Sequence, residues 1–434
     1  MSLAVRFARA RAVAAPRPIG RVTRLVGLNV EVTGIEAAVG DVVRISLPDR
    51  LIDTEVVALR ETGLACMPFG DLKGVRYGTP AEALSRPMTV PVGEPLLGRV
   101  LDGLGHPVDD GPPLPALEQV TVDGGPPHPL RREMVDTQLG LGVRVLDTLV
   151  PCGQGQRLGI FAGSGVGKSS ILSMIARGTR ADISVVALIG ERGREVSEFI
   201  QRDLGPEGLA RSVVVVATAD QPALVRIRAA FTATRIAEWF RDRGSDVVLM
   251  MDSLTRFAMA QREVGLSAGE PPATRGYPPS VFALLPKLLE RAGAAERGSI
   301  TGLYTVLVEG DDLNEPIADA ARSILDGHLV LSRRLASAGH FPSVDVLESI
   351  SRVGPAITSP DRRAAAAELR RLMAAYQDAR DLIEIGAYVR GTNPTVDRAV
   401  DLKDFINAFL RQEMSEAADL DDSWARLGAL VGIR

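Results

Sequence analysis

AGSGVGKS, residues 162–169, is the stretch of sequence that decides the fold of this chain. Its three glycines let the backbone wrap so that successive N–H groups point at phosphate oxygens. Lys168 can then reach the terminal phosphates, and the Ser169 hydroxyl can ligate magnesium. A predicted strand, residues 156–161, precedes the stretch, and a predicted helix, residues 169–176, follows it. A phosphate-binding loop requires this strand–loop–helix context, so the sequence predicts a nucleotide site in an α/β core.

The phosphate cradle departs from the usual GxxxxGK[ST] pattern at one position, because Ala162 stands where the first glycine is expected. An alanine fits there if its φ is negative, since the remaining glycines still supply a permissive backbone. We therefore predict a functional cradle in which the serine after the lysine binds magnesium. Its predicted members are Gly163, Ser164, Gly165, Val166, Gly167, Lys168, Ser169 and Ser170.

Composition narrows the class of protein. The chain has 434 residues, of which 46% are hydrophobic, 24% charged and 4% aromatic, and its formal net charge is −4. These values exclude a disordered chain and a polycation for nucleic acid, and the few aromatic residues argue against base-stacking platforms. Cys66 and Cys152 cannot build a disulfide framework or a four-ligand zinc site, and they indicate reduced thiols in a cytoplasmic protein. The apolar runs are of strand length, so no membrane-spanning helix is predicted.

Four regions are predicted along the chain. Residues 1–20 form an N-terminal arm. Short β-branched runs punctuated by glycines predict a small antiparallel β-barrel over residues 21–95. Residues 96–345 form the P-loop core, and residues 346–434 form a helical C-terminal domain.

The core is predicted as a parallel sheet covered by helices on both faces. Apolar runs separated by helical segments, such as residues 222–241, are typical of this α/β arrangement. Strand signals fade after Ser343, and apolar residues at helical spacing then predict helices. The predicted core strands are residues 158–161, 183–189, 213–217, 247–251 and 301–308. The predicted C-terminal helices include residues 362–377, 402–410 and 424–430.

Two carboxylates are predicted at the carboxyl edge of the sheet, where ligands of such folds bind. Asp252 ends the predicted strand 246–251 and is a candidate magnesium ligand; the alternative is an aspartate that caps the next helix. Glu191 follows the run 183–189 and is a candidate for activating water; the alternative is a solvated loop glutamate. Arg192 beside it is a candidate to contact phosphate or to hold Glu191 by a salt bridge.

Several strings of this sequence resemble those of known families. GSGVGKS at 163–169, GERGRE at 190–195 and MDSLTR at 251–256 resemble the catalytic subunits of rotary ATPases. A narrower resemblance is to the type III secretion ATPases, among which the flagellar protein export ATPases are most similar. The strings that carry it are EPPATRGYPPSVF at 270–282, VEGDDLNEPIAD at 308–319, RSILDGH at 322–328 and GHFPSVDVL at 339–347.

The resemblance implies a RecA-like core and an ATPase that works as a homohexameric ring. The family's arginine finger lies in a Ser-x-Ser-Arg-Val string, which here is residues 349–353. Arg352 would therefore reach the site of the neighbouring protomer and act there with Lys168 and Glu191. The relatives hold the adenine between aromatic side chains, which the resemblance places at Phe341 and Tyr388.

The resemblance also implies Mg²⁺-ATP as the substrate and a function in flagellar or type III protein export, by chaperone release, cargo unfolding and delivery to the export gate. The implied partners are regulator and stalk proteins of the export apparatus, secretion chaperones with their cargo, and a membrane export gate. The chain would be cytoplasmic and peripherally associated with the inner face of the cytoplasmic membrane, and no nucleic acid is expected. Three alternatives stay open: a catalytic subunit of a rotary ATP synthase, a ring-shaped RNA or DNA translocase, and a regulatory nucleotide-binding subunit without activity.

Overall fold

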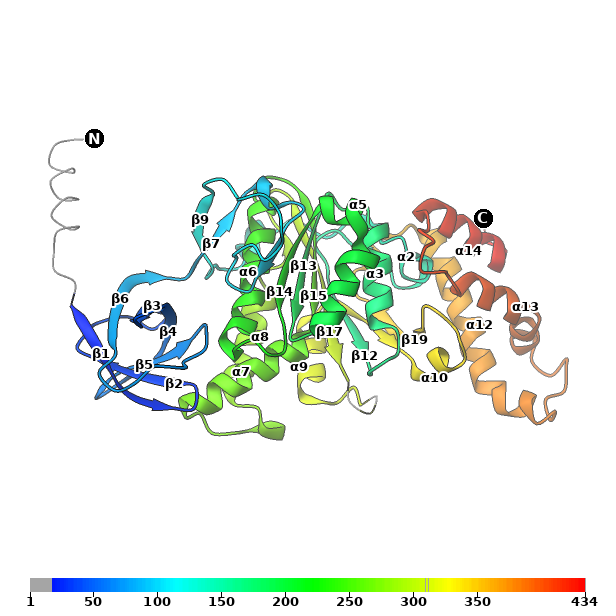
Figure 1. Ribbon diagram of the computed structural model, residues 1–434. Helices are drawn as coiled ribbons and strands as arrows, with labels where there is room; N and C mark the ends of the chain where they lie inside the picture. The colour runs from blue at the N-terminus through cyan, green and yellow to red at the C-terminus, as the bar shows by residue number, and fades with distance from the viewer. Residues whose placement is uncertain (1–17, 309, 311, 434) are drawn as a thin grey trace.

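Three parts follow one another along the molecule: a β-barrel near the N-terminus, a central sheet between helices, and a helical C-terminal region (Figure 1). The computed structural model describes residues 18–308, 310 and 312–433. Residues 1–17 of the predicted N-terminal arm therefore lie outside the described residues. Strand β1 begins at Ile19. Among the described residues, no helix has the length and apolar character needed to cross a membrane.

Six antiparallel strands close into the barrel, as the sequence predicted. Alternate residues such as Val30, Val32, Val43 and Ile45 are completely buried inside it. In sheet order the strands are β1 (Ile19–Val26), β2 (Asn29–Thr33), β5 (Gly63–Pro68), β4 (Leu51–Arg60), β3 (Asp41–Ser46) and β6 (Pro80–Pro87).

The barrel ends earlier than the predicted limit at residue 95. After Pro87 the chain forms β7 (Thr89–Val92), which pairs with β9 (Glu118–Thr121) in a separate two-stranded sheet. The reason is packing, because Val90 and Val92 are buried in the hydrophobic cluster of the core and not in that of the barrel.

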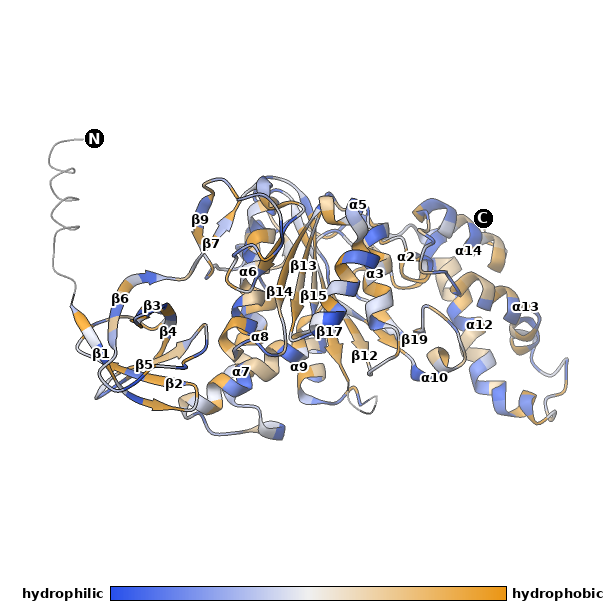
Figure 2. Ribbon diagram, viewed as in Figure 1, coloured by the Kyte–Doolittle hydropathy of each residue, from blue (hydrophilic) through white to orange (hydrophobic). Residues whose placement is uncertain are grey.

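The central sheet confirms the predicted parallel architecture and every predicted core strand. Figure 2 shows hydrophobic residues along its central strands, which helices cover. In sheet order the strands are β19 (Val344–Ser351), β18 (Gly327–Leu331), β12 (Arg157–Ala162), β17 (Ser299–Leu307), β15 (Asp246–Asp252), β13 (Ile183–Ile189), β14 (Ser212–Ala217) and β8 (Val100–Asp102). The short strand β16 (Gly293–Ala294) pairs with β17, and β10 (Gln138–Leu139) pairs with β11 (Cys152–Gly153).

The predicted helix 222–241 is present with nearly the same bounds, and those predicted at 169–176, 362–377, 402–410 and 424–430 are present with longer ones. In the core the helices are α2 (Arg144–Leu149), α3 (Lys168–Gly178), α4 (Gly193–Glu198), α5 (Gly205–Ala210), α6 (Ala223–Arg241), α7 (Leu254–Ala268), α8 (Pro279–Leu289), α9 (Pro316–Ile324) and α10 (Arg333–Ser337). A π-helical turn (Phe199–Leu204) joins α4 to α5. The last helices are α11 (Gly354–Ile357), α12 (Pro360–Glu384), α13 (Pro394–Leu410) and α14 (Leu420–Val431).

One boundary is corrected by the structure. The predicted division between core and helical domain at residues 345 and 346 falls inside strand β19, which pairs antiparallel with β18 at the edge of the sheet. The expectation that strands end near Ser343 failed because β19 is an edge strand. Its buried residues alternate with polar ones such as Asp345 and Glu348, so it lacks the continuous apolar run of the inner strands.

Candidate functional site

The phosphate cradle lies between the end of β12 and the start of α3. Gly165 and Gly167 have φ values of 76° and 102°, a left-handed conformation that side chains disfavour, so glycine is required at both positions. Ala162 instead ends β12 as an ordinary strand residue with negative φ, paired with Leu307 and Leu331. The substitution of alanine for the usual first glycine therefore leaves the backbone of the cradle intact.

Three charged side chains meet beside the cradle. The Lys168 Nζ lies 2.5 Å from Asp252 Oδ1 and 3.2 Å from Glu191 Oε1. Thr305 Oγ1 donates a hydrogen bond of 2.8 Å to the same Asp252 oxygen. The three charged side chains are 8–14% exposed, so their attraction is only weakly screened by water.

Sheet topology explains why residues so far apart in sequence meet here. Asp252 is the last residue of β15, and Glu191 follows β13 after a tight turn at Gly190, whose φ is 71°. These two strands are parallel neighbours, with Leu188 opposite Asp252. The predicted position of both carboxylates at the carboxyl edge of the sheet is thus confirmed.

The electrostatics of the site favour proton transfer near neutral pH. Burial, and after it the charge of Asp252, raises the pKa of Glu191 to about 7, and a hydrogen bond with Glu195 acts in the same direction. Burial alone would lower the pKa of Lys168, but Asp252 and Glu191 together raise it above its usual value. A carboxyl with such a pKa can accept a proton from water and release it again.

The residues at this edge fit magnesium only together with a nucleotide. Among the described residues, no group of three or more His, Cys, Asp or Glu side chains is arranged to hold a metal ion. Magnesium, however, needs few protein ligands when phosphate oxygens supply the others. The Asp252 carboxylate and the hydroxyl of Ser169, in the first turn of α3, are the oxygen donors that such an ion prefers.

Arg192 lies next to Glu191 in sequence but does not hold it. Its side chain is 82% exposed and forms an ion pair with Glu195, with an N···O distance of 3.7 Å. The predicted salt bridge between Arg192 and Glu191 is therefore corrected. The cause is local geometry, since Arg192 and Glu195 are one turn apart at the start of α4.

Phe341 lies beside the cradle. Its ring carbons would be 3.8 Å from a Cβ placed on Gly167, and Ser343 Oγ donates a hydrogen bond of 2.5 Å to the carbonyl oxygen of Val166. Phe341 is 45% exposed, so part of its surface is available to a ligand.

Tyr388 lies elsewhere, and its predicted place beside the adenine is corrected. Its hydroxyl contacts the carbonyl oxygen of Asn393 at 3.1 Å and Asp397 Oδ1 at 3.0 Å, in the turn that begins α13. Figure 1 shows that turn at the outer end of the helical region, far from the start of α3.

The segment after α13 approaches Phe341 instead. The backbone N–H of Gln412 donates to the carbonyl oxygen of Phe341 at 3.0 Å, and Met414, which is 41% exposed, follows two residues later. The sequence gives no signal for this segment, because its methionine belongs to no motif.

Arg352 lies at the opposite edge of the sheet from the cradle of its own chain. Ala162, at the end of β12 that leads into the cradle, pairs with Leu331 at the last residue of β18. Ser351, at the end of β19, pairs with Gly327 at the first residue of β18. The four residue steps from Gly327 to Leu331 span about 13 Å along the strand. Arg352 is exposed, and its Nη2 donates to the carbonyl oxygen of Arg322 at 3.2 Å.

Comparisons with known proteins show which family the chain belongs to. Residues 142–351 match the nucleotide-binding domain of the ATP synthase alpha/beta family, and residues 358–429 match the T3SS EscN ATPase C-terminal domain. The flagellum-specific ATP synthase of Bacillus subtilis is 52% identical over 417 residues, which cover 95% of each chain.

Two solved structures are similar over the same length. The assembled ATPase EscN of the type III secretion system of enteropathogenic E. coli has a TM-score of 0.90, and EscN in complex with its central stalk EscO has one of 0.88. Both are 44% identical and cover 95% of this chain and 100% of their own. The chain therefore belongs to the type III secretion ATPase family, which includes the flagellum-specific ATP synthases, and it is an ATPase.

Proposed function

We propose that this ATPase hydrolyses Mg²⁺-ATP in a composite site, to which one protomer contributes the phosphate cradle and the next contributes Arg352. The observation that carries the proposal is the sheet register, because Arg352 and the cradle of its own chain lie at opposite edges. An arginine in that position can serve only the nucleotide of another copy. Contacts of this head-to-tail kind close into rings, and we propose a homohexamer.

Each side chain at the site has a proposed part in the reaction. Lys168 exchanges its carboxylate partners for the terminal phosphates, while Ser169 and Asp252 hold the magnesium ion, which neutralises phosphate charge when bound. Glu191 takes a proton from the water whose oxygen attacks the γ-phosphorus, as the bond from that phosphorus to the leaving diphosphate breaks. Arg352 of the neighbour neutralises the charge that develops, a contribution of about 10³- to 10⁵-fold in rate.

Two further residues have proposed parts in binding. Phe341 packs one face of its ring against the adenine, which its exposure beside Gly167 supports. Arg192, with its exposed guanidinium at the start of α4, turns from Glu195 to a phosphate oxygen when the nucleotide is present.

The energy of hydrolysis is proposed to drive flagellar or type III protein export. The match of residues 358–429 to the C-terminal domain of EscN supports export over rotary ATP synthesis and over nucleic-acid translocation. By analogy with EscN and its stalk EscO, one proposed partner is a central stalk protein. The others are a regulator of the export apparatus, secretion chaperones with their cargo, and a membrane export gate that the ring contacts peripherally.

A mixed-ring experiment tests the composite site. Lys168→Ala and Arg352→Ala are each expected to abolish hydrolysis in pure rings, because every site then lacks one half. When the two variants are co-expressed with different affinity tags and purified together, hydrolysis should return to about a quarter of the wild-type rate, since one contact in four pairs an intact cradle with an intact arginine. Mixed rings that remain inactive would refute the composite site.

A further inference from the structure

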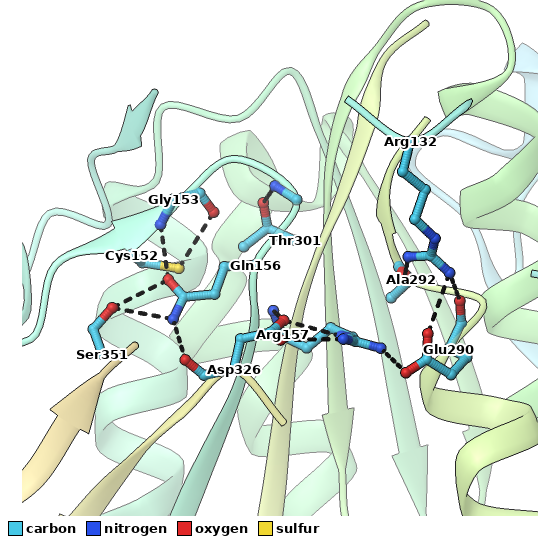
Figure 3. A network of polar contacts seen from close by, with 11 residues as sticks. Arg132, Cys152, Gly153, Gln156, Arg157, Glu290, Ala292, Thr301, Asp326 and Ser351 are labelled. Carbon is cyan, nitrogen blue, oxygen red and sulfur yellow. Dashed lines mark hydrogen bonds and ion pairs between the residues drawn. The ribbon is translucent and has the colours of Figure 1, made fainter. Parts of the chain in front are cut away.

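Gln156 is a fully buried polar residue at the amino edge of the sheet, directly before β12. Its Oε1 accepts a hydrogen bond from the backbone N–H of Gly153 at 2.9 Å. Its Nε2 donates to the carbonyl oxygen of Asp326 at 3.0 Å and to Ser351 Oγ at 3.1 Å (Figure 3). One amide side chain thus joins three segments that are distant in sequence.

The Asp326 carbonyl oxygen receives a second bond, from the backbone N–H of Arg352 at 3.0 Å. Gln156 and this carbonyl therefore fix both Ser351 and Arg352, the two residues at which β19 ends and the chain emerges on the surface.

Asp326 is itself held through its side chain. Its carboxylate accepts bonds of 3.0–3.1 Å from the backbone and guanidinium of Arg157. Arg157 in turn forms an ion pair of 2.5 Å with Glu290, which also contacts Arg132 (Figure 3). The carbonyl that binds Arg352 therefore belongs to a residue in a charged, interlinked and partly buried network, and such networks hold their members in one arrangement.

This network is remote from the cradle of its own chain. Gln156 and Ala162 stand at opposite ends of β12, six residues or about 20 Å apart. A direct effect of Gln156 on bound phosphate in the same chain is therefore excluded by distance.

We propose that Gln156 is a positioning residue for Arg352: together with Asp326 it fixes the direction in which the arginine leaves the sheet, and so its place in the site of the neighbouring protomer. The inference rests on the proposed function, in which Arg352 completes the site of the next copy. It assigns to Gln156 an effect on the neighbour's hydrolysis and none on nucleotide held in its own cradle.

The mixed ring of Lys168→Ala and Arg352→Ala subunits separates these effects. In it the Lys168→Ala subunit donates the arginine and the Arg352→Ala subunit donates the cradle. Gln156→Leu in the arginine donor should lower the kcat of the mixed ring about tenfold or more with unchanged KM, because small misplacements of a catalytic group are costly. The same change in the cradle donor should alter kcat less than about twofold, which also shows that the variant folds and assembles.

Two serines on β19 give a milder variant and its control. Ser351→Ala removes only the hydroxyl that Gln156 contacts, and should lower kcat when it is in the arginine donor. Ser349→Ala removes a buried hydroxyl of the same strand that bonds Val330 and Asp345, and should leave kcat unchanged in either donor.

The outcomes distinguish the two proposals. A parental mixture without activity refutes the composite site and the positioning role with it. An active parental mixture that loses activity equally from both donors, or from neither, refutes the positioning role of Gln156 alone.

Discussion

A charged pair at the centre of the core gives a sharp prediction about stability. Glu238 on α6 and Arg291 after α8 are each 1% exposed, and two hydrogen bonds of 2.7 Å join their carboxylate and guanidinium. Arg291 also donates to the carbonyl oxygen of Val122 at 3.0 Å, and Arg235 forms an ion pair with Glu238 at 3.0 Å. The pair therefore connects α6, the end of α8 and the chain that leads from the barrel.

Glu238→Ala is expected to destabilise the core by about 3–5 kcal/mol, because it leaves the Arg291 guanidinium buried without its counter-charge. Glu238→Gln should lose most of the same free energy, since its amide group would face another donor. The double variant Glu238→Leu/Arg291→Met removes both charges and keeps the volume, so we expect it to regain stability to within about 1 kcal/mol of the parent.

The assay uses a natural reporter. The chain has two tryptophans, and Trp239 directly follows Glu238 on α6, where its Nε1 donates to Glu118 and Arg243 stacks on its ring. Urea unfolding followed by the fluorescence of Trp239, in a Trp424→Phe background, measures the core around this pair. A double variant as unstable as Glu238→Ala would refute the reasoning, because the loss would then come from packing and not from an unpaired charge.

Three further predictions concern catalysis, pH and the docking of the barrel. Glu191→Gln should bind a fluorescent ATP analogue normally yet lower kcat by about 10²- to 10⁴-fold in a phosphate-release assay; ordinary turnover would exclude its role as base. Burial raises the pKa of Asp147 from 3.8 to about 7. Its contribution to the free energy of unfolding is therefore full below about pH 4 and lost as the pH rises through about 7. The stability deficit of Asp147→Asn should accordingly shrink between pH 5 and pH 8 when unfolding is followed by Trp424 fluorescence, and a constant deficit would contradict it. Glu55→Ala removes the buried partner of Arg228 between barrel and core, so limited proteolysis should cut between the two faster than in the parent; equal rates would show that the pair does not hold the barrel.

The fold could be predicted from the sequence wherever one signal was continuous. The run 183–189 is apolar except for Ser184 because β13 is buried on both faces, and its predicted bounds are those observed. β19 escaped prediction because an edge strand alternates apolar and polar residues. A short alternating segment next to helices has no pattern that separates it from a loop.

The candidate site likewise contains residues that the sequence could place and residues that it could not. Glu191 and Asp252 could be placed because each follows a buried strand, and strand ends share one edge of a parallel sheet. Gln156 could not, since its partners Asp326 and Ser351 are 170 and 195 residues away and the residue belongs to no motif. The prediction for Tyr388 was wrong because it rested on the aromatic residue type alone, and the sequence does not show the turn that holds this side chain.

The antiparallel edge strand has a consequence for stoichiometry. If each complete site needs the strand end of one copy and the cradle of the next, sites are counted by contacts and not by chains. A single chain then has no complete site, an open row of chains has one site fewer than its members, and only a closed ring has as many sites as subunits. Turnover per subunit becomes a measure of assembly, and a cell could silence the enzyme by holding its rings open, without altering any residue of the cradle.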